Sequence, residues 1–267
     1  PEASQPELTM SPVRLEQQDS LAWLHLQRPE AYNAFTREMA GELLEHLFQL
    51  RQDESVKVVA ITGEGSVFSA GGDLKWVSSH PQGPSTAFHE LATRVHLCIT
   101  EIRRFPKPIL AVINGTAAGG GFSLALACDF RLIAETARLK QAFTSQGLCL
   151  DGGGTWFLPR LVGLGRALEI AALDEWISAE QALNWGLVNR VVSPEQLTAE
   201  TLSWANRLAE RSSHAFATVK QLLNESWNTP LETQLEHERQ GLVRTVEHSD
   251  GQEGLSAFLE KRPPRFA

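Results

Sequence analysis

One stretch near the middle of the chain, residues 113–130, limits the possible folds more than any other. The apolar run Ile109–Ile113 leads into it, three consecutive glycines at 119–121 turn the chain, and residues rich in alanine and leucine follow. This order predicts a buried strand, a tight turn and the start of a buried helix. Glycines let a ligand come close to the backbone, and the first N–H groups of a helix have no partner within it. The turn is therefore either an anion site or a turn that only lets strand and helix pack closely.

Strand and helix patterns alternate along the chain up to about Val192, and only helical patterns follow Pro194. Alternation of this kind predicts an α/β fold with a largely parallel sheet. We expect a disordered lead-in over residues 1–12, an α/β core over residues 13–193 and a helical region over residues 194–267.

The individual elements follow from hydrophobic period, capping residues and the positions of glycine and proline. The patterns predict a hairpin with strands at 13–16 and 21–26, a helix after the N-cap Thr36, further strands at 56–62, 109–113, 130–134 and 186–192, and helices at 88–102, 156–172 and 178–185. Residues 67–76 are predicted to form a second glycine turn and residues 80–84 a polar loop.

Composition excludes some classes of partner. The chain has 24 Lys and Arg against 32 Asp and Glu, with a net charge of -8 and an isoelectric point near 5.5. Surfaces that bind nucleic acid or lie on a membrane need clustered Lys and Arg, so we expect neither partner. Any polyanionic ligand must then be met by local positive charge.

The three cysteines, Cys98, Cys128 and Cys149, include no Cys-x-x-Cys pair and cannot all be paired with one another. We expect reduced, buried thiols in an intracellular compartment, which is the cytoplasm in a bacterium and the mitochondrial or peroxisomal matrix in a eukaryote. No apolar run is long enough to span a bilayer, and the sequence shows no basic then apolar leader.

Several familiar site patterns do not fit. None of the glycine turns matches Gly-x-Gly-x-x-Gly, and no Gly-Lys-Ser/Thr closes a phosphate loop. Ser123 lies in Gly-Phe-Ser-Leu-Ala, one residue from a nucleophile elbow, but it falls within the predicted helix and is better interpreted as a packed small residue. His89 and His96 lie seven apart on one predicted helix without a third ligand. We interpret them as surface or satisfied core histidines and expect no metal site.

A series of motifs spans the chain from about Val13 to Phe266. In order they are Arg28-Pro-x-x-x-Asn-Ala34, Phe68-Ser-Ala-Gly-Gly-Asp-Leu74, Pro108-Ile-Leu-Ala-Val-Ile-Asn-Gly115, Gly119-Gly-Gly121, Cys128-Asp129, residues 147–155 with Leu158-Pro-Arg-Leu-Val-Gly163, Ala182-Leu-Asn-Trp-Gly-Leu-Val188 and Glu253-Gly-Leu-Ser-Ala-Phe-Leu-Glu-Lys-Arg-Pro263. The series resembles the enoyl-CoA hydratase/isomerase (crotonase) superfamily, and so many matches in one order argue against chance.

The resemblance implies a ClpP/crotonase-like spiral of ββα units, a C-terminal helical region used to form a homotrimer or a dimer of trimers, and an acyl-CoA thioester as substrate. It assigns an oxyanion hole for the thioester carbonyl to the N–H groups of Ala70 and Gly120, since fixed donors stabilise the charge of an enolate. It assigns contacts with CoA to Arg28, Ala70, Gly72, Asp73, Leu74, Lys75 and, from a neighbouring subunit, Lys261. Either lysine could equally be ordinary solvated surface.

Two departures from the family pattern bear on the reaction. Hydratases that this chain resembles carry two glutamates that hold and activate a water, and here those positions are Ser123 and Phe143. Neither side chain exchanges a proton as a carboxylate does. We therefore expect ordinary hydratase activity to be weak or absent.

One acid, Asp151, remains near the expected site. It lies among apolar and glycine residues, where a carboxyl group is harder to ionise and suited to carry a proton from one carbon to another. From the residues alone, an N-cap for the helix near Gly153 is the simpler interpretation. Within the family this position resembles the catalytic aspartate of dienoyl-CoA isomerases and of the ring-epoxide isomerase of phenylacetyl-CoA degradation. Aromatic-acyl-CoA dehalogenases also place a nucleophilic aspartate here, but with a tryptophan where this chain has Phe143.

The sequence thus predicts an acyl-CoA isomerase that shifts a carbon–carbon double bond through an enolate, with Asp151 as general acid and base. No cofactor is expected, because the CoA thioester is the substrate itself. The acyl pocket is predicted to be lined by Trp76, the loop at 81–88, Phe122, Ser123, Phe143 and Trp156. The alternatives are hydration, hydrolysis or dehalogenation of an acyl-CoA, and a homologue that binds acyl-CoA or another protein without turnover.

Overall fold

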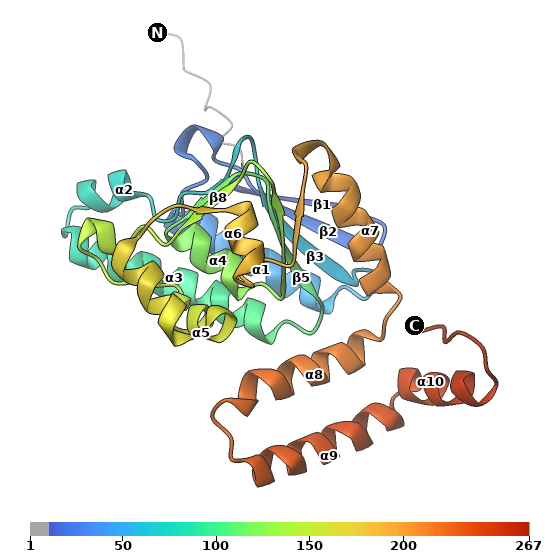
Figure 1. Ribbon diagram of the computed structural model, residues 1–267. Coiled ribbons are helices and arrows are strands. Elements are labelled where there is room, and N and C mark those ends of the chain that lie inside the picture. Colours follow the sequence, from blue (N-terminus) through green and yellow to red (C-terminus); the bar gives the residue numbers. More distant parts are fainter. Residues whose placement is uncertain (1–10, 267) are drawn as a thin grey trace.

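Continuous apolar runs of the sequence form the central strands of a six-stranded sheet. The computed structural model, which describes residues 11–266, orders this sheet as β1-β2-β3-β5-β7-β10 (Figure 1). Its strands are β1 (Val13–Gln18), β2 (Leu21–Leu26), β3 (Val58–Gly63), β5 (Ile109–Ile113), β7 (Phe130–Ala134) and β10 (Arg190–Val192). β1 and β2 pair antiparallel as the predicted hairpin, and the other neighbours pair parallel. Every residue of β3 and β5 is buried, as expected for parallel strands covered on both faces.

A second sheet has four short strands in the order β4-β6-β8-β9. They are β4 (Val67–Ser69), β6 (Thr116–Ala118), β8 (Arg138–Lys140) and β9 (Ile177–Ser178). β4, β6 and β8 run parallel, so the segments that follow them all leave the sheet at the carboxyl ends of these strands. The two glycine turns and the segment that carries Asp151 are therefore brought together there.

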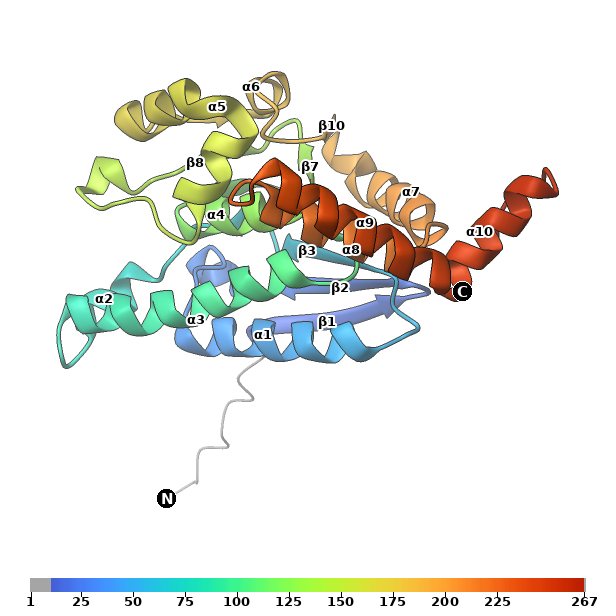
Figure 2. The same cartoon turned by 90° about the horizontal axis from the view of Figure 1, so that it is seen from below.

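Helices cover both faces of the larger sheet. α1 and α3 lie side by side in Figure 2, and α7 packs against the sheet on the other face. The helices are α1 (Arg37–Gln52), α2 (Leu74–Ser79), α3 (Pro84–Arg104), α4 (Gly120–Ala127), α5 (Gly154–Leu173), α6 (Ala179–Asn184), α7 (Leu197–Ala209), α8 (Ser213–Ser226), α9 (Leu231–Glu247) and α10 (Ser249–Leu259), with 3-10 turns at Pro29–Ala31, Thr144–Gln146 and Pro194–Gln196.

Local signals set several helix ends as predicted. The Thr36 hydroxyl accepts a hydrogen bond from the Met39 N–H at the start of α1, and Ser178 with Gln181 forms the predicted capping box of α6. α3 begins four residues earlier than predicted. Gly83 takes a positive φ of 86° that ends the loop, and Pro84 occupies the first helical position, where its missing N–H costs no hydrogen bond.

The short helix α2 begins within the segment that the sequence predicts to be a glycine turn and continues to Ser79. Asp73 caps it, because its carboxylate accepts hydrogen bonds from the N–H groups of Lys75 and Trp76. The short strands β6, β8 and β9 were also not predicted. Their length of two or three residues leaves no room for a hydrophobic period.

The helices after the last strand divide into two groups. α7 packs on the larger sheet through Leu197 and Ala205, so it belongs to the core although it lies beyond residue 193. In Figure 1, α8, α9 and α10 lie apart from the core, below the sheets; in Figure 2, α10 extends beyond the core, whereas α8 and α9 lie in front of it. These three carry many exposed large apolar side chains, namely Val219, Leu223, Trp227, Leu231, Leu235, Leu242, Val243, Val246, Leu255, Phe258 and Leu259.

A buried ion pair fastens α8 to the core. Lys220 Nζ lies 2.8 Å from Asp129 Oδ2 and 2.9 Å from the carbonyl oxygen of Ile102, at the end of α3. The same carboxylate oxygen accepts a hydrogen bond from the Ile109 N–H at the start of β5. Burial raises the pKa of the Asp129 carboxyl, and Lys220 acts in the opposite direction. The pair therefore joins α3, β5, the start of β7 and α8 at one point.

Of the predicted lead-in, residues 1–10 lie outside the described part of the chain. Pro12 is ordered, because its carbonyl accepts a hydrogen bond of 2.8 Å from the Gln27 N–H and extends the pairing of the hairpin. Between residues 11 and 266, no helix is long and apolar enough to cross a membrane.

Candidate active site

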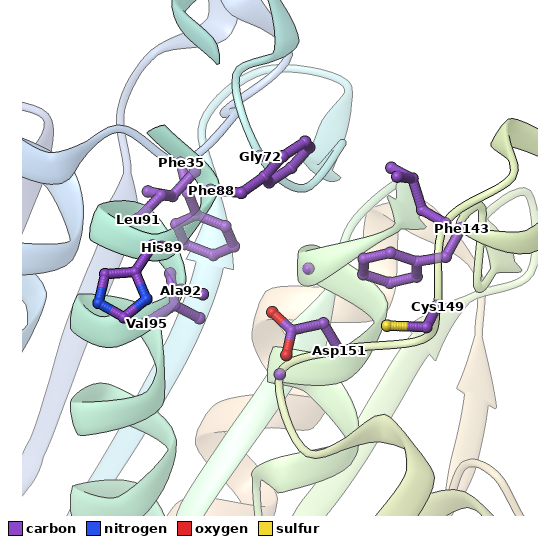
Figure 3. Close-up of a pocket in the computed structure, with 13 residues that line it drawn as sticks. Phe35, Gly72, Phe88, His89, Leu91, Ala92, Val95, Phe143, Cys149 and Asp151 are labelled. Carbon is purple, nitrogen blue, oxygen red and sulfur yellow. The ribbon is translucent and has the colours of Figure 1, made fainter. Parts of the chain in front are cut away.

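A cavity of about 330 Å³ opens at the edge of the smaller sheet where the three loops meet. It lies between one face of α3 and the segment around Phe143, Cys149 and Asp151 (Figure 3). The residues that line it are Phe35, Gly72, Phe88, His89, Leu91, Ala92, Val95, Gly120, Phe143, Leu148, Cys149, Asp151 and Gly152. Most of them are apolar, and Asp151 is the only carboxylate among them.

The α3 wall follows from helical spacing. Phe88, Leu91, Ala92 and Val95 recur every three or four residues and so share one face of the helix. Phe88 was predicted to lie in a loop next to the acyl group. It does line the cavity, but from the second turn of α3.

The two glycine turns pack directly against each other. A Cβ atom on Gly71 would come within 2.7 Å of the Gly120 nitrogen, and one on Gly121 would come within 2.4 Å of the Ser69 carbonyl oxygen. Real Cβ atoms do not approach backbone atoms this closely, so larger residues would push the turns apart. The glycines predicted from the sequence are thus required for the turns to meet.

The backbone hydrogen bonds decide which N–H groups of these turns are free. The Ala70 N–H donates to the Tyr32 carbonyl at 3.0 Å and is therefore occupied. Phe35 pairs with the backbone on either side of Gly72: its N–H donates to the Gly71 carbonyl, and its carbonyl accepts from the Asp73 N–H. This pairing does not use the Gly72 N–H. In the described part of the chain, no hydrogen bond uses the Gly72 N–H.

Gly120 has a free N–H for a different reason. It is the first residue of α4, and the first N–H groups of a helix have no partner inside it. Gly72 and Gly120 both line the cavity, and Ala70 does not. The prediction of Gly120 agrees with this geometry, whereas the prediction of Ala70 is replaced by Gly72, two residues further along the same turn.

Asp151 is held by its side chain and by its backbone. A hydrogen bond of 2.8 Å joins Asp151 Oδ1 to His96 Nε2 on α3. The Asp151 carbonyl accepts a hydrogen bond of 2.6 Å from the Ser123 hydroxyl and one of 3.2 Å from the Gly154 N–H. The N-cap of α5 is Gly153, which has no side-chain cap. The interpretation of Asp151 as an N-cap is therefore wrong.

The surroundings of Asp151 differ from those that its sequence neighbours suggest. Its side chain is 43% exposed and that of His96 is 50% exposed. The closest polar partner comes from a helix 55 residues earlier in the chain. Asp151 thus sits at the open side of an apolar cavity, paired with an imidazole.

Ser123 is fully buried inside α4. Its hydroxyl is occupied by the Asp151 carbonyl, and a Cβ atom on Gly152 would meet its own Cβ at 2.9 Å. It therefore supports the segment that carries Asp151 and does not line the cavity. This position also removes Ser123 as a hydrolase nucleophile, because no substrate can reach its oxygen.

Besides Phe88, only Phe143 of the predicted aromatic pocket residues lines the cavity. Phe122 is fully buried in the hydrophobic core, since α4 is covered on every side. Trp156 lies on the first turn of α5 and is covered by the guanidinium groups of Arg103 and Arg160. Trp76 packs edge to face against His80. These three side chains make other contacts and do not line the cavity, which differs from the prediction.

The residues predicted to bind CoA, except Lys261, surround the glycine turn at residues 70–72. Arg28 and Asp73 bind each other, with 3.0 Å between Arg28 Nη2 and Asp73 Oδ2. Burial alone would raise the pKa of Asp73, but hydrogen bonds from the Trp76 N–H and Arg28 hold it below its usual value. Leu74 and Lys75 are exposed on α2.

Lys261 follows α10, at the opposite end of the molecule from α2 in Figures 1 and 2, so a contact with CoA in the same subunit is excluded.

Sequence reasoning missed His96 and Cys149 as site residues. The spacing of His89 and His96 placed both on one helix face, but only the fold brings His96 to Asp151.

Cys98 and Cys128 are buried, which raises the pKa of both thiols to about 12. Cys149 is exposed and lines the cavity, contrary to the expectation of three buried thiols. Among residues 11–266, no group of three or more His, Cys, Asp or Glu could hold a metal ion.

Comparisons with known proteins agree with the fold and give different reactions. A family model described as Enoyl-CoA hydratase/isomerase matches residues 16–267. An Escherichia coli protein named 1,2-epoxyphenylacetyl-CoA isomerase is 38% identical over 244 residues, which are 91% of this chain and 93% of that protein. An Arthrobacter protein named 4-chlorobenzoyl coenzyme A dehalogenase-2 is 36% identical over 253 residues, which are 93% and 91% of the two chains. The crystal structure of an enoyl-CoA hydratase from a Polaromonas species has a TM-score of 0.91 at 37% identity and covers 96% of this chain and 99% of that chain.

Proposed function

We propose that this chain, which belongs to the enoyl-CoA hydratase/isomerase family, is an acyl-CoA isomerase that moves a carbon–carbon double bond by proton transfer. The observation that carries the proposal is the position of Asp151. Asp151 lines the same cavity as Gly72 and Gly120, whose N–H groups are free, and no other carboxylate is among the residues that line it. Ser123 and Phe143 occupy the positions where hydratases of this family carry glutamates, which favours proton transfer over the addition of water.

In the proposed reaction, the thioester oxygen binds to the Gly72 and Gly120 N–H groups. Asp151 takes a proton from the acyl chain, and the electron pair moves onto the thioester oxygen to form a dienolate. The two N–H groups stabilise the charge that develops there, which is the largest single contribution in many such reactions. Asp151 then returns the proton to a different carbon, so the double bond has moved and the composition is unchanged.

The cavity supports an apolar acyl group. Phe35, Phe88 and Phe143 contribute aromatic surface to a volume of about 330 Å³, which suits a ring-derived or medium-chain acyl group. CoA would lie across the glycine turn at residues 70–72, with Lys75 available to its phosphates. The reaction as proposed needs no further cofactor, since the thioester itself accepts the electron pair.

We also propose that α8, α9 and α10 join copies of this chain into a homotrimer or a dimer of trimers. These helices carry many exposed large apolar side chains, and gathered apolar surface of this kind marks interaction sites. Assembly would place Lys261 of one copy next to the CoA site of another, which a single copy cannot do.

The variant Asp151→Asn tests the proposed role of Asp151. The amide keeps the shape of the side chain and its bond to His96 but cannot take a proton. We expect the kcat for isomerisation of an unsaturated acyl-CoA to fall by about 10² to 10⁴, the usual contribution of a general base. A panel of unsaturated and ring-derived acyl-CoA esters, followed by mass spectrometry, identifies the substrate for this measurement.

Three results would contradict the proposal. Stable incorporation of oxygen from labelled water into the product would indicate a hydratase or hydrolase. Tight binding of acyl-CoA esters without turnover across the panel would indicate a binding protein. A loss in kcat below about tenfold in Asp151→Asn would remove Asp151 as the base.

A second candidate function is displacement of a halide, with Asp151 as the nucleophile. The imidazole of His96 next to an exposed carboxylate favours it, because hydrolysis of the resulting ester needs a base near the attacking water. Phe143, where the dehalogenases that this chain resembles carry a tryptophan, is against it. Release of chloride from 4-chlorobenzoyl-CoA by the wild-type protein would favour displacement over isomerisation.

A further inference from the structure

The contact between His96 and Asp151 gives the proposed isomerase a residue that neither its local sequence nor its family motifs pointed to. We propose that His96 is a positioning residue, which holds Asp151 Oδ1 so that the second carboxylate oxygen, Oδ2, is the atom that carries the proton. This inference rests on the proposed function, because it assigns a task to a neighbour of the proposed base.

The hydrogen bond has an ordinary donor–acceptor distance. The distance between His96 Nε2 and Asp151 Oδ1 is 2.8 Å, within the range for a nitrogen donor and a carboxylate. Among residues 11–266, no other hydrogen bond to either oxygen of this carboxylate is present. Imidazole donates from Nε2 both as imidazolium and as the neutral tautomer protonated there, so the contact persists in both charge states.

His96 is attached to a rigid part of the molecule. α3 is a helix of 21 residues that packs along α1, and Val95, the residue before His96, lines the cavity. The backbone of His96 is thus fixed relative to the α3 wall on which the acyl group would lie. The hydrogen bond between the two half-exposed side chains ties the Asp151 carboxylate to that helix.

The Asp151 side chain needs such a support because several hydrogen bonds hold the backbone of this residue but only one holds its carboxylate. Ser123 and Gly154 fix its carbonyl, and Gly152 and Gly153 follow with positive φ angles of 64° and 80°. The side chain has two rotatable bonds and is 43% exposed, so without a partner it would move between rotamers and bind water. Cys149 and His89 also line the cavity, but neither is hydrogen-bonded to Asp151.

The consequence for the reaction is that the two carboxylate oxygens have different roles. Oδ1 accepts the imidazole N–H and is the poorer proton acceptor. Oδ2 has no partner in the described residues, so it is the oxygen available to remove the proton from one carbon and deliver it to another. Positional errors of about 1 Å in such a transfer cost about 10² in rate, which is the scale of effect that a positioning residue controls.

The test compares His96→Ala with His96→Gln. The amide N–H of glutamine reaches about as far as Nε2 of histidine and donates the same bond without a titratable ring. We expect His96→Ala to lower kcat by about 30-fold and to leave KM within about threefold, because the substrate-binding surfaces are untouched. His96→Gln should recover kcat to within about fivefold of the wild type.

The outcomes separate this inference from the proposed function. An unchanged kcat in His96→Ala, or an equal loss in both variants, would overturn the positioning role. A lower thermal unfolding midpoint in His96→Ala that His96→Gln shares would indicate a structural role instead. Asp151→Asn is measured beside them. If Asp151→Asn keeps its activity, the proposed function fails; if it loses activity while His96→Ala does not, only the positioning role fails.

Discussion

The two sides of the cavity are built by different means. At the glycine turns, the groups assigned to the proposed reaction are backbone N–H groups, and the neighbouring Gly71 and Gly121 pack so closely that a single methyl group does not fit on either. On the other side, the group assigned to the proposed reaction is the end of a side chain, 43% exposed and held by one hydrogen bond to His96. The first side is determined by packing and the second by a single polar contact.

This difference shows which part of the site is open to change. Backbone donors survive almost any substitution that the packing tolerates, because every residue except proline carries an N–H. A side-chain acid is lost or gained with one substitution. The same turns can therefore serve isomerases, hydratases and dehalogenases, while the reaction is decided on the opposite side of the cavity.

Removing one backbone donor without disturbing the fold tests this comparison most strongly. Gly120 is the first residue of α4, a position where proline is accepted because its N–H has no helical partner. We expect Gly120→Pro to lower kcat by about 10² to 10³, the usual loss for one such donor. Initial rates with the substrate from the acyl-CoA panel measure it.

Gly120→Ala is the matched control, because alanine keeps the N–H. A Cβ atom there meets the Phe35 ring at 3.4 Å, an ordinary contact. We expect this variant to stay within about tenfold of the wild type. Equal losses in the alanine and proline variants would mean that the side chain, not the missing donor, is responsible.

The packing of the turns is tested by Gly121→Ala. A Cβ atom at Gly121 would lie 2.4 Å from the Ser69 carbonyl oxygen, so the two turns must separate. We expect a loss of about 1 to 3 kcal/mol in the free energy of unfolding, typical of overpacking, and a fall in kcat of about tenfold. Urea denaturation measures the first and initial rates the second.

Gly165→Ala is its control, since nothing lies within 4 Å of a Cβ atom at that position and its φ is not positive. The helix α5 should gain slightly in stability from it, by about 0.5 to 1 kcal/mol. If Gly121→Ala matched Gly165→Ala, the close approach of the two turns would not be required.

The backbone support of Asp151 is expected to matter least. Ser123→Ala removes the hydroxyl that binds the Asp151 carbonyl, but the Gly154 N–H still satisfies that oxygen. We expect a loss of about 1 kcal/mol in stability and a fall in kcat of about threefold. Ser226→Ala, which removes an exposed hydroxyl bonded to the Leu223 carbonyl, provides the comparison. A loss in Ser123→Ala as large as that of His96→Ala would show that both anchors are equally needed.

Much of the fold follows from local sequence. The central strands β3 and β5 are buried apolar runs, and α1 and α6 carry caps that mark their first residues. The smaller sheet could not be predicted in the same way. Its strands have two or three residues and exist only because distant segments pair, which no local period records.

The candidate site shows the same limit. The glycine turns were predicted because glycine itself is the signal, and the error at Ala70 arose because only the hydrogen bond to Tyr32 shows that this N–H is occupied. Phe122 was predicted to face the acyl group, but α4 is apolar on all sides and its pattern does not say which side is open. The pairing of His96 with Asp151 depends on the fold alone.

The ion pair between Lys220 and Asp129 has a consequence for how this chain is made. The carboxylate is synthesised 91 residues before the ammonium group that neutralises it, and a buried carboxylate without its partner is strongly unfavourable. A chain in which α8 has not yet been made therefore leaves the Asp129 carboxylate without its counter-ion, and the contacts around it reach their full stability only once α8 is in place.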